Sequence, residues 1–215
     1  RDTVLIQLYK GVGPCDSVDM YRNIHTKLEI PKFFGHIVAT AAKPNIVKNM
    51  TPYQIGTKPG HRAQEHLFVI KSVIGLAEAN NTAVALQLWD LSKYFDRESL
   101  KDGLNELYKS NVRGKVYKLL YELNKDTRIS VRTPVGDTEQ RETGEGWGQG
   151  TIEGAIFSAV NLDNGVKDFF STSEYEISYG DLALSPLLFQ DDICRIALSP
   201  FTAQMGNDKL EALAE

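Results

Sequence analysis

Hydrophobic positions along the chain follow two spacings, one typical of α-helices and one typical of β-strands. Apolar residues three and four positions apart predict helices, and short β-rich runs predict strands. The expected helices cover residues 30–49, with a break or kink at Pro44, residues 61–80, a stretch capped by Asp96 that runs through Leu104 and Leu107, residues 112–123, and a stretch after a glycine-rich loop that includes residues 156–162. The expected strands cover residues 4–9, 83–89 and 129–133, followed by a hairpin of residues 182–189 and 193–198.

Two of the strongly apolar runs end in acidic residues. Residues 83–89 form a nearly continuous apolar run, as expected for a strand buried on both faces, and Asp90 follows it. The predicted hairpin carries Asp191 and Asp192 at its tip. If the two strands are neighbours in one sheet, the three carboxylates converge. Taken singly, each feature also fits a polar turn or an isolated acid at a strand end, because Asp is common in turns.

The composition is that of a globular protein with a sizeable core. The chain has 215 residues, of which 42% are hydrophobic and 24% are charged. It lacks the roughly 18 to 20 consecutive apolar residues of a membrane-spanning helix and an N-terminal secretion signal, so we expect no membrane partner and a cytoplasmic or nuclear location. Because the chain begins at Arg1 and ends at Glu215 within an amphipathic stretch, we interpret it as an excerpt of a longer polypeptide.

Charge is distributed unevenly along the chain. Residues 1–71 contain ten Lys and Arg against five Asp and Glu, whereas the remainder contains fourteen against twenty-three, which gives the net charge of −4. A basic first third and an acidic remainder suit a protein that holds phosphates with one part and cations with another. Uneven but solvated surface charge is the alternative interpretation.

The acidic residues at the strand ends predict a magnesium site. Carboxylates a few ångströms apart raise one another's pKa, and hard divalent cations with oxygen ligands relieve that repulsion. The histidines and cysteines lack the paired spacing of zinc sites, so oxygen ligands remain the candidates. Two Mg²⁺ ions roughly 3.5 to 4 Å apart would support in-line phosphoryl transfer, which is polymerase or nuclease chemistry, and Mn²⁺ is a possible substitute.

Five short motifs occur in an order that carries more information than any one of them. They are Tyr-Lys-Gly at 9–11 with Tyr-Arg-Asn-Ile at 21–24, Lys-Pro-Gly-His-Arg at 58–62, Leu-Trp-Asp-Leu-Ser-Lys-Tyr-Phe-Asp at 88–96, Gly-Gln-Gly at 148–150, and Phe-Gln-Asp-Asp at 189–192. In this order they resemble the fingers and palm motifs of reverse transcriptases of the non-LTR retrotransposon and group II intron type. The resemblance spans almost the whole chain.

The resemblance implies an α+β fold, a right-hand polymerase with fingers and palm, whose antiparallel palm sheet is backed by helices and whose thumb is absent. Residues 1–80 would be fingers-like and residues 81–215 a C-terminally truncated palm. The implied activity is that of an RNA-directed DNA polymerase, a nucleotidyltransferase of a retroelement. Its implied partners are an RNA template, a DNA primer, dNTPs and further domains of a parent polyprotein.

The resemblance also assigns roles to individual residues. Asp90 and Asp191 would ligate both metal ions, and Asp192 would be a less direct ligand or an orienting acid. Phe95 matches the position where a bulky ring blocks the 2′-hydroxyl of a ribonucleotide. Residues implied to contact the dNTP are Phe95, Gln149, Gly150, Lys10, Arg22 and Arg62, and those implied to contact the template are Gly148 and Gln149.

Two positions depart from the family pattern. Gln190 replaces the usual small or apolar residue of the Asp-Asp motif, and Glu153 is expected to bring an unusual charge near the template path.

The sequence leaves two alternatives to the leading interpretation. One alternative is a non-catalytic nucleic-acid-binding remnant of a retroelement. The other is an RNA-dependent RNA polymerase, which Phe95 disfavours.

Overall fold

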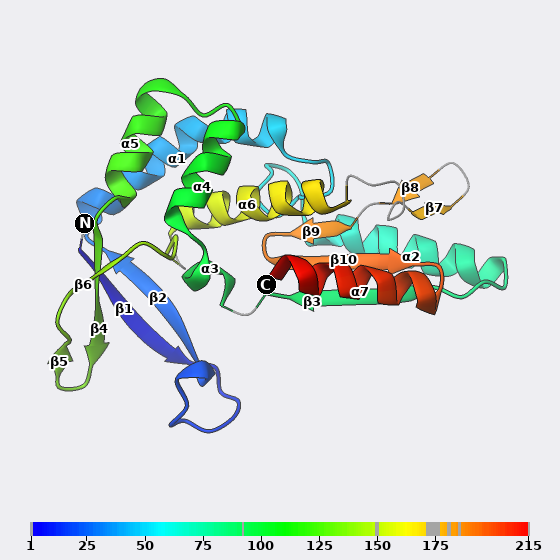
Figure 1. Cartoon of the computed structure of the whole chain (residues 1–215), viewed down its shortest axis with the longest axis horizontal. Helices are drawn as coiled ribbons and strands as arrows, with labels where there is room; N and C mark the ends of the chain where they lie inside the picture. Colours follow the sequence, from blue (N-terminus) through cyan, green and yellow to red (C-terminus); the bar gives the residue numbers. More distant parts are fainter. Residues whose placement is uncertain are drawn as a thin grey trace. The chain divides into compact units, whose positions relative to one another are not determined.

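A computed structural model describes residues 2–91, 93–148, 151–170, 177–179, 182–184 and 186–214, and shows a mixed α and β protein (Figure 1). Its helices are the 3₁₀ turn η1 (Val18–Met20), α1 (Glu29–Asn49), α2 (Ala63–Ala79), α3 (Tyr94–Arg97), α4 (Leu100–Lys109), α5 (Gly114–Asn124), α6 (Ile152–Phe170) and α7 (Pro200–Ala214). Its strands are β1 (Asp2–Tyr9), β2 (Tyr21–Lys27), β3 (Ala85–Asp90), β4 (Thr127–Thr133), β5 (Gly136–Asp137), β6 (Arg141–Thr143), β7 (Ile177–Tyr179), β8 (Leu182–Leu184), β9 (Leu187–Phe189) and β10 (Asp192–Ala197). Within this described part of the chain, no helix has the length and apolar character needed to cross a membrane.

The chain forms two compact units, each built from two separate segments. The first unit comprises Arg1–Asn49 and Lys93–Asn161, and the second comprises Met50–Ser92 and Leu162–Glu215. Helix α6 contributes residues to both. These boundaries do not coincide with residue 80, where the sequence motifs divide fingers from palm, so that division stays a prediction.

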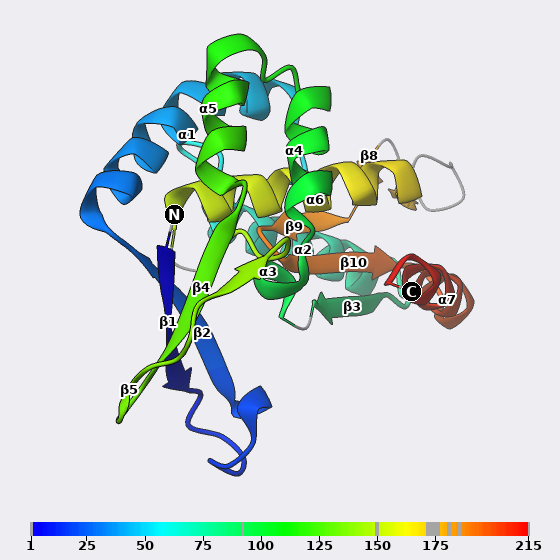
Figure 2. The ribbon, with the colours of Figure 1, turned by 60° about the vertical axis from the view of Figure 1, so that its left-hand side comes forward.

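The first unit is organised around a sheet in the order β2-β1-β4, to which β5 and β6 add antiparallel pairs with β4. Strands β1 and β2 run antiparallel, whereas β1 and β4 run parallel. Helices α1 and α5 lie side by side, as Figure 2 shows, and α4 packs against α5. Apolar side chains at helical spacing on α1, among them Val38, Ala42 and Ile46, are buried in the core of this unit.

The second unit contains the sheet in the order β3-β10-β9, and both pairings are antiparallel. Helix α7 contacts β3 and β10 on one face, and it lies in front of them in Figure 1. Val73 of α2 packs against Ile196 and Ala197 of β10 in a buried cluster. The sheet is therefore held between two helices, as the sequence motifs lead one to expect for a sheet backed by helices.

Residues 83–89 were predicted to form a strand buried on both faces, and this prediction is wrong for β3, because one face of the strand is exposed. Leu88 is 76% exposed and Leu86 is 42% exposed on one face of the strand. On the other face, the Gln87 side chain donates to Oδ1 of Asn207 on α7 at 2.6 Å, and the Trp89 indole N–H donates to the same oxygen at 3.0 Å. Strand β3 is an edge strand, so its covered face depends on a polar network.

Three further local predictions are wrong. Helix α1 continues through Pro44 to Asn49, so of the break or kink predicted there, the break does not occur. Asp96 lies inside α3, and the cap of α4 is Ser99, whose hydroxyl accepts from the Asp102 backbone N–H at 3.3 Å. The run 182–189 is divided, because β8 pairs with β7 while β9 pairs with β10. The predicted hairpin is confined to the residues nearest its tip.

The remaining helices and strands agree with the hydrophobic pattern. Helices were expected over residues 61–80 and 112–123 and correspond to α2 and α5, and strands were expected over 4–9 and 129–133 and correspond to β1 and β4. The glycine-rich stretch leads into α6, as expected. These segments are the ones with the clearest periodicity.

A buried carboxyl group joins α3 to α6 in the first unit. Glu98 is 5% exposed, and its Oε2 accepts from the Ser158 hydroxyl at 2.6 Å. Burial raises the pKa of Glu98 to about 7, although hydrogen bonds from Ser158, Asn161 and Tyr94 oppose the rise. The folded chain therefore retains a proton on Glu98 in a pH range where the unfolded chain has lost it.

This proton makes the stability of the chain depend on pH. The stabilisation is fully present below pH 4.5, the ordinary pKa of the group, and is lost as the pH rises to about 7. The Glu98→Gln variant lacks this loss. Between pH 4.5 and about pH 7, the free energy of unfolding of the wild type should therefore fall by roughly 3 kcal/mol more than that of the variant. Urea denaturation at several pH values measures the difference. The exposed Glu139→Gln is the control, and an equal pH trend in both variants would contradict the assignment.

Candidate functional site

The three acidic residues expected to form a site lie at one end of the sheet in the second unit. Asp90 is the last residue of β3, Asp192 is the first residue of β10, and the two are directly opposite each other in the antiparallel pairing. Asp191 occupies the two-residue turn between β9 and β10. The expectation that the two acid-bearing strands are neighbours is confirmed.

Two of these acids lie on the face of the sheet opposite α7. Directly opposed residues of an antiparallel pair project from the same face, so Asp90 and Asp192 share a face with the next same-face pair, Leu88 and Cys194. Gln87 and Trp89, which contact α7, alternate with them on the opposite face. Asp90 and Asp192 are exposed, and Asp191 is half-buried.

The electrostatics of the turn reflect the crowding of carboxylates. Burial raises the pKa of Asp191 above its ordinary value, and the negative charges of Asp192 and Asp90 raise it further. A hydrogen bond from its own backbone N–H acts in the opposite direction. The charged form of Asp191 is therefore disfavoured unless a cation is near.

The donor set suits a hard divalent cation. In the described part of the chain, no Lys, Arg or His lies within ion-pair distance of these three carboxylates, so their charge is available to a metal ion. Among the same described residues, no three His, Cys, Asp or Glu side chains are gathered into a ready coordination group. The backbone brings the acids to one place, and coordination would require their side chains to turn toward a common ion.

A segment between α1 and α2 supports the turn that carries Asp191. The Ile55 backbone N–H donates to the Leu188 carbonyl at 3.0 Å, and the Leu188 N–H donates to the Tyr53 carbonyl at 3.0 Å. Gln54, between them, is completely buried, and its side-chain amide bonds the backbone of Gln190 in the turn. This short stretch extends the sheet beyond β9.

Close packing and backbone conformation make the turn unusual. Gln190 has a φ of 58°, in the left-handed region, which costs a non-glycine residue about 1 kcal/mol. A Cβ at Gly56 would lie 2.4 Å from the Gln190 nitrogen, so only glycine fits there. The sequence pattern does not predict the roles of Gln54 and Gly56. They lie in a loop-like stretch, where no periodicity distinguishes a buried residue from an exposed one.

The first unit brings Phe95 next to the glycine-rich loop. The Trp147 backbone N–H donates to the Phe95 carbonyl at 3.2 Å, and Gly148 follows Trp147. Gly148 has a φ of 82°, and a Cβ there would lie 3.3 Å from the His25 side chain. Gln149 and Gly150, predicted to contact template and dNTP, lie outside the described residues.

Asp96, the neighbour of Phe95, joins α3 to β2. The Asn23 side-chain amide donates to Oδ2 of Asp96 at 3.0 Å, and His25 Nε2 lies 3.6 Å from Oδ1. Trp147, which precedes Gly148, stacks edge-to-face on Phe157 with ring centroids 4.9 Å apart. Phe95 and Gly148 are thus attached to buried parts of the first unit.

The predicted phosphate ligands are divided between the units. Lys10 and Arg22 belong to the β1–β2 hairpin of the first unit, and Arg62 precedes α2 in the second unit. Arg22 alternates along β2 with Asn23, so it projects from the face opposite to the one that contacts Asp96. Arg22 and Arg62 are exposed, and their phosphate-binding role stays a prediction.

Lys10 belongs to a group of basic residues that surrounds one acid. Its ammonium donates to the Asp19 backbone carbonyl at 3.0 Å, and Lys93 forms an ion pair with the Asp19 carboxylate at 2.5 Å. Lys93 lowers the pKa of Asp19 most, by hydrogen bonding and charge, and Lys10 and Arg97 contribute. Basic side chains that follow β1, cap α3 and lie within α3 therefore gather around Asp19.

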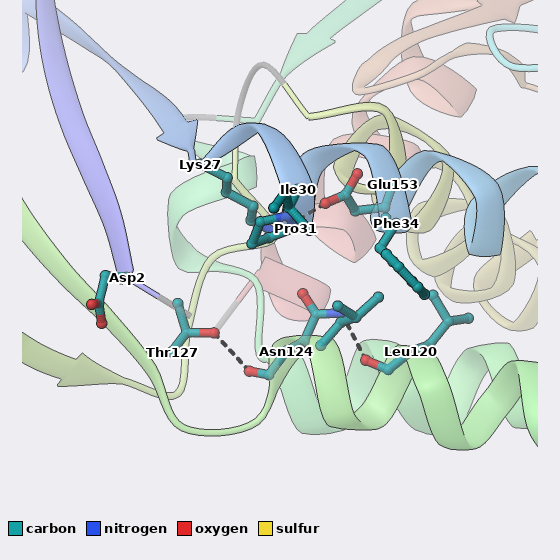
Figure 3. Close-up of a pocket in the computed structure, with 11 residues that line it drawn as sticks. Asp2, Lys27, Ile30, Pro31, Phe34, Leu120, Asn124, Thr127 and Glu153 are labelled. Carbon is teal, nitrogen blue, oxygen red and sulfur yellow. Dashed lines mark hydrogen bonds and ion pairs between the residues drawn. The ribbon is translucent and has the colours of Figure 1, made fainter.

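Glu153, which the sequence analysis expects near the template path, is buried and neutralised. Its side chain is 5% exposed and pairs with the Lys27 ammonium at 2.9 Å. Figure 3 shows the two side chains meeting at a cavity of about 230 Å³ that Ile30, Pro31 and Phe34 of α1 also line. A Cβ at Gly35 would lie 2.8 Å from a Glu153 oxygen, so α1 approaches this carboxylate closely.

Comparison with known proteins shows similarity of fold without similarity of sequence. No protein-family model and no curated protein matches the chain. Telomerase of Candida albicans, solved with the TWJ fragment of telomeric RNA, matches with a TM-score of 0.67 at 12% identity over 98% of this chain and 38% of that one. Apo telomerase of Candida tropicalis matches with a TM-score of 0.63 at 12% identity, over 96% of this chain and 43% of that one.

A third structure, described as an RdRp complex, matches with a TM-score of 0.57 at 14% identity over 99% of this chain and 19% of that one. The chain has a polymerase-like fold. It spans less than half the length of each of these three structures. At such low identity the likeness is one of fold.

The Lys27–Glu153 pair in this polymerase-like fold gives a stability prediction. Lys27→Met leaves the Glu153 carboxylate buried without its cation, and the free energy of unfolding should fall by roughly 3 kcal/mol. The double variant Lys27→Met with Glu153→Gln removes the stranded charge and should recover most of the loss. Urea denaturation measures both variants. Equal instability of the single and double variants would show that packing, and not charge, explains the effect.

Proposed function

We propose that this chain is the polymerase module of an RNA-directed DNA polymerase, which adds dNTPs to a primer 3′-hydroxyl with two Mg²⁺ ions, or Mn²⁺ in their place. The observation that carries the proposal is the pairing of Asp90 with Asp192 and the position of Asp191 in the adjoining turn. Two motifs about a hundred residues apart thereby supply carboxylates to one sheet end, as two-metal nucleotidyl transfer requires.

In the proposed reaction, the two ions, when bound, activate the primer hydroxyl and stabilise the charge on the leaving pyrophosphate. Asp90 and Asp191 provide oxygen ligands for them, and Asp192 supports these ligands. Because nucleotidyl transfer depends mainly on positioning and charge stabilisation, the remaining residues bind and orient the substrates. Those with proposed contacts to the dNTP are Phe95, Gln149, Gly150, Lys10, Arg22 and Arg62, and those with proposed contacts to the template are Gly148 and Gln149.

The proposed partners are an RNA template, a DNA primer and dNTPs. The Candida albicans telomerase structure contains RNA, which supports an RNA partner for a chain of similar fold. The basic group of Lys10, Lys93 and Arg97 gives the first unit a surface suited to phosphates. A retroelement origin of the non-LTR or group II intron type, with further domains in the parent polyprotein, rests on the sequence motifs.

Two other functions are alternatives to the proposal. One is a polymerase that makes RNA instead of DNA, and the other is a nucleic-acid-binding protein without catalytic activity. An RNA-dependent RNA polymerase is supported by the similarity to the RdRp complex, and the ring of Phe95 argues against it. A non-catalytic nucleic-acid-binding remnant would keep the fold without the reaction. The uncompensated carboxylates argue against a remnant, because a site without function has no need for acids that repel one another.

Primer extension on an RNA template tests the proposed reaction. The chain with Mg²⁺ and dNTPs should extend a DNA primer, and Asp90→Asn or Asp191→Asn should lower the rate by roughly a thousandfold or more. Asp208→Asn is the matched control, since Asp208 is an exposed carboxylate of α7 in the same unit. Template binding without extension, unchanged in Asp191→Asn, would instead support the non-catalytic remnant.

Substitution of Phe95 tests the choice of sugar. Phe95→Ala removes the ring that would collide with a 2′-hydroxyl, so the preference for dNTPs over NTPs should fall by roughly 10- to 100-fold. Phe95→Tyr keeps the ring and should keep the preference. The ratio of kcat/KM for the two nucleotides measures it. Equal preference in the wild type and Phe95→Ala would exclude Phe95 from sugar selection.

A further inference from the structure

Gln54 fixes both peptide planes around the left-handed residue Gln190. Its Nε2 donates to the Gln190 carbonyl at 3.0 Å, and its Oε1 accepts from the Gln190 N–H at 3.0 Å. The same Oε1 accepts from the Gly56 N–H at 3.1 Å, which anchors the amide to its own loop. One side chain thus defines the conformation of the first turn residue.

The second of these peptide planes leads directly to Asp191. The plane that contains the Gln190 carbonyl also contains the nitrogen and Cα of Asp191, and the Asp191 side chain projects from that Cα. The Gln54 amide therefore holds the peptide plane from which the Asp191 side chain projects. Rotation of this plane would move the acid away from Asp90 and Asp192.

Burial makes the arrangement rigid. Gln54 is completely buried, and the backbone on either side of it is bonded to Leu188 of β9. Gly56 leaves no space between this loop and the turn. A rotamer that broke the bonds to Gln190 would leave a buried amide without partners, which is costly.

We propose that Gln54 is a positioning residue that orients the Asp191 carboxylate for binding of divalent cations. This inference rests on the proposed function, because it concerns the same acids. It also accounts for Gln190, which departs from the family pattern: the contacts from Gln54 go to the backbone of residue 190, so they do not require a small side chain there.

Binding of Mn²⁺ to the chain, followed by the EPR signal of free Mn²⁺, tests the proposal without relying on activity. The wild type should bind Mn²⁺, and Asp191→Asn should lose this binding. Gln54→Met has a similar volume but makes no bonds to Gln190, and it should weaken Mn²⁺ binding by roughly 10- to 100-fold, the usual effect of losing a group that orients a ligand. Gln54→Glu keeps the acceptor but replaces the donor with an oxygen of a buried carboxyl group, so it should weaken binding in the same direction.

A matched control separates positioning from stability. Ser199→Ala removes a hydroxyl of the same unit that follows β10 at the end opposite the turn, where it accepts from the Thr202 backbone N–H of α7 at 3.1 Å. It should lower Tm while leaving the Kd for Mn²⁺ within about twofold of the wild type, as a change remote from the ligands does. Adding Gln190→Gly to Gln54→Met, which relieves the left-handed strain, should restore part of the binding.

Each contrary outcome has a defined meaning. Mn²⁺ binding by folded Gln54→Met or Gln54→Glu that equals the wild type would overturn the positioning role alone. Equal weakening in Ser199→Ala would also overturn it, because general destabilisation would then explain the loss. No Mn²⁺ binding by the wild type, or undiminished binding by Asp191→Asn, would overturn the proposed metal site and the role of Gln54 with it.

Discussion

The antiparallel register between β3 and β10 is the constraint on which the site depends, because it sets Asp192 opposite Asp90. A slip of one residue would turn each side chain of β10 to the other face of the sheet. The covered face opposes such a slip: the buried guanidinium of Arg195 donates to Gln87 at 2.8 Å and to the Thr202 carbonyl at 2.8 Å. A Cβ at Gly206 would lie 2.2 Å from Arg195, so α7 also fits this side chain closely.

The register brings together groups that repel one another, and the surrounding structure must hold them. Buried apolar residues such as Ile193 and Leu188 stabilise the strands behind the acids. At the turn, hydrogen bonds from Gln54 offset the left-handed conformation of Gln190. The cost of an exposed acidic end is thus met by packing and hydrogen bonds elsewhere in the second unit, which is common at functional sites.

Prediction from sequence succeeded where a pattern is local and failed where the partner is distant. The hairpin tip with Asp191 and Asp192 follows from two apolar runs around a polar turn, and neighbouring strands then bring in Asp90. The support by Gln54 spans 136 positions and leaves no periodic signal. Lys27 and Glu153 likewise pair across 126 positions, so the sequence showed only an isolated charge at Glu153. A polymerase-like fold that persists at 11–14% identity shows how few residue identities such an arrangement needs.

The most direct test of the account is a crystal structure of the chain grown with Mn²⁺, with the ions located by anomalous scattering. The account predicts two peaks about 3.5 to 4 Å apart at the end of the β3–β10 pair, both within coordination distance of Asp90 and Asp191. Absence of ions at these acids, with the β3–β10 register intact and Mn²⁺ bound at other carboxylates, would contradict it.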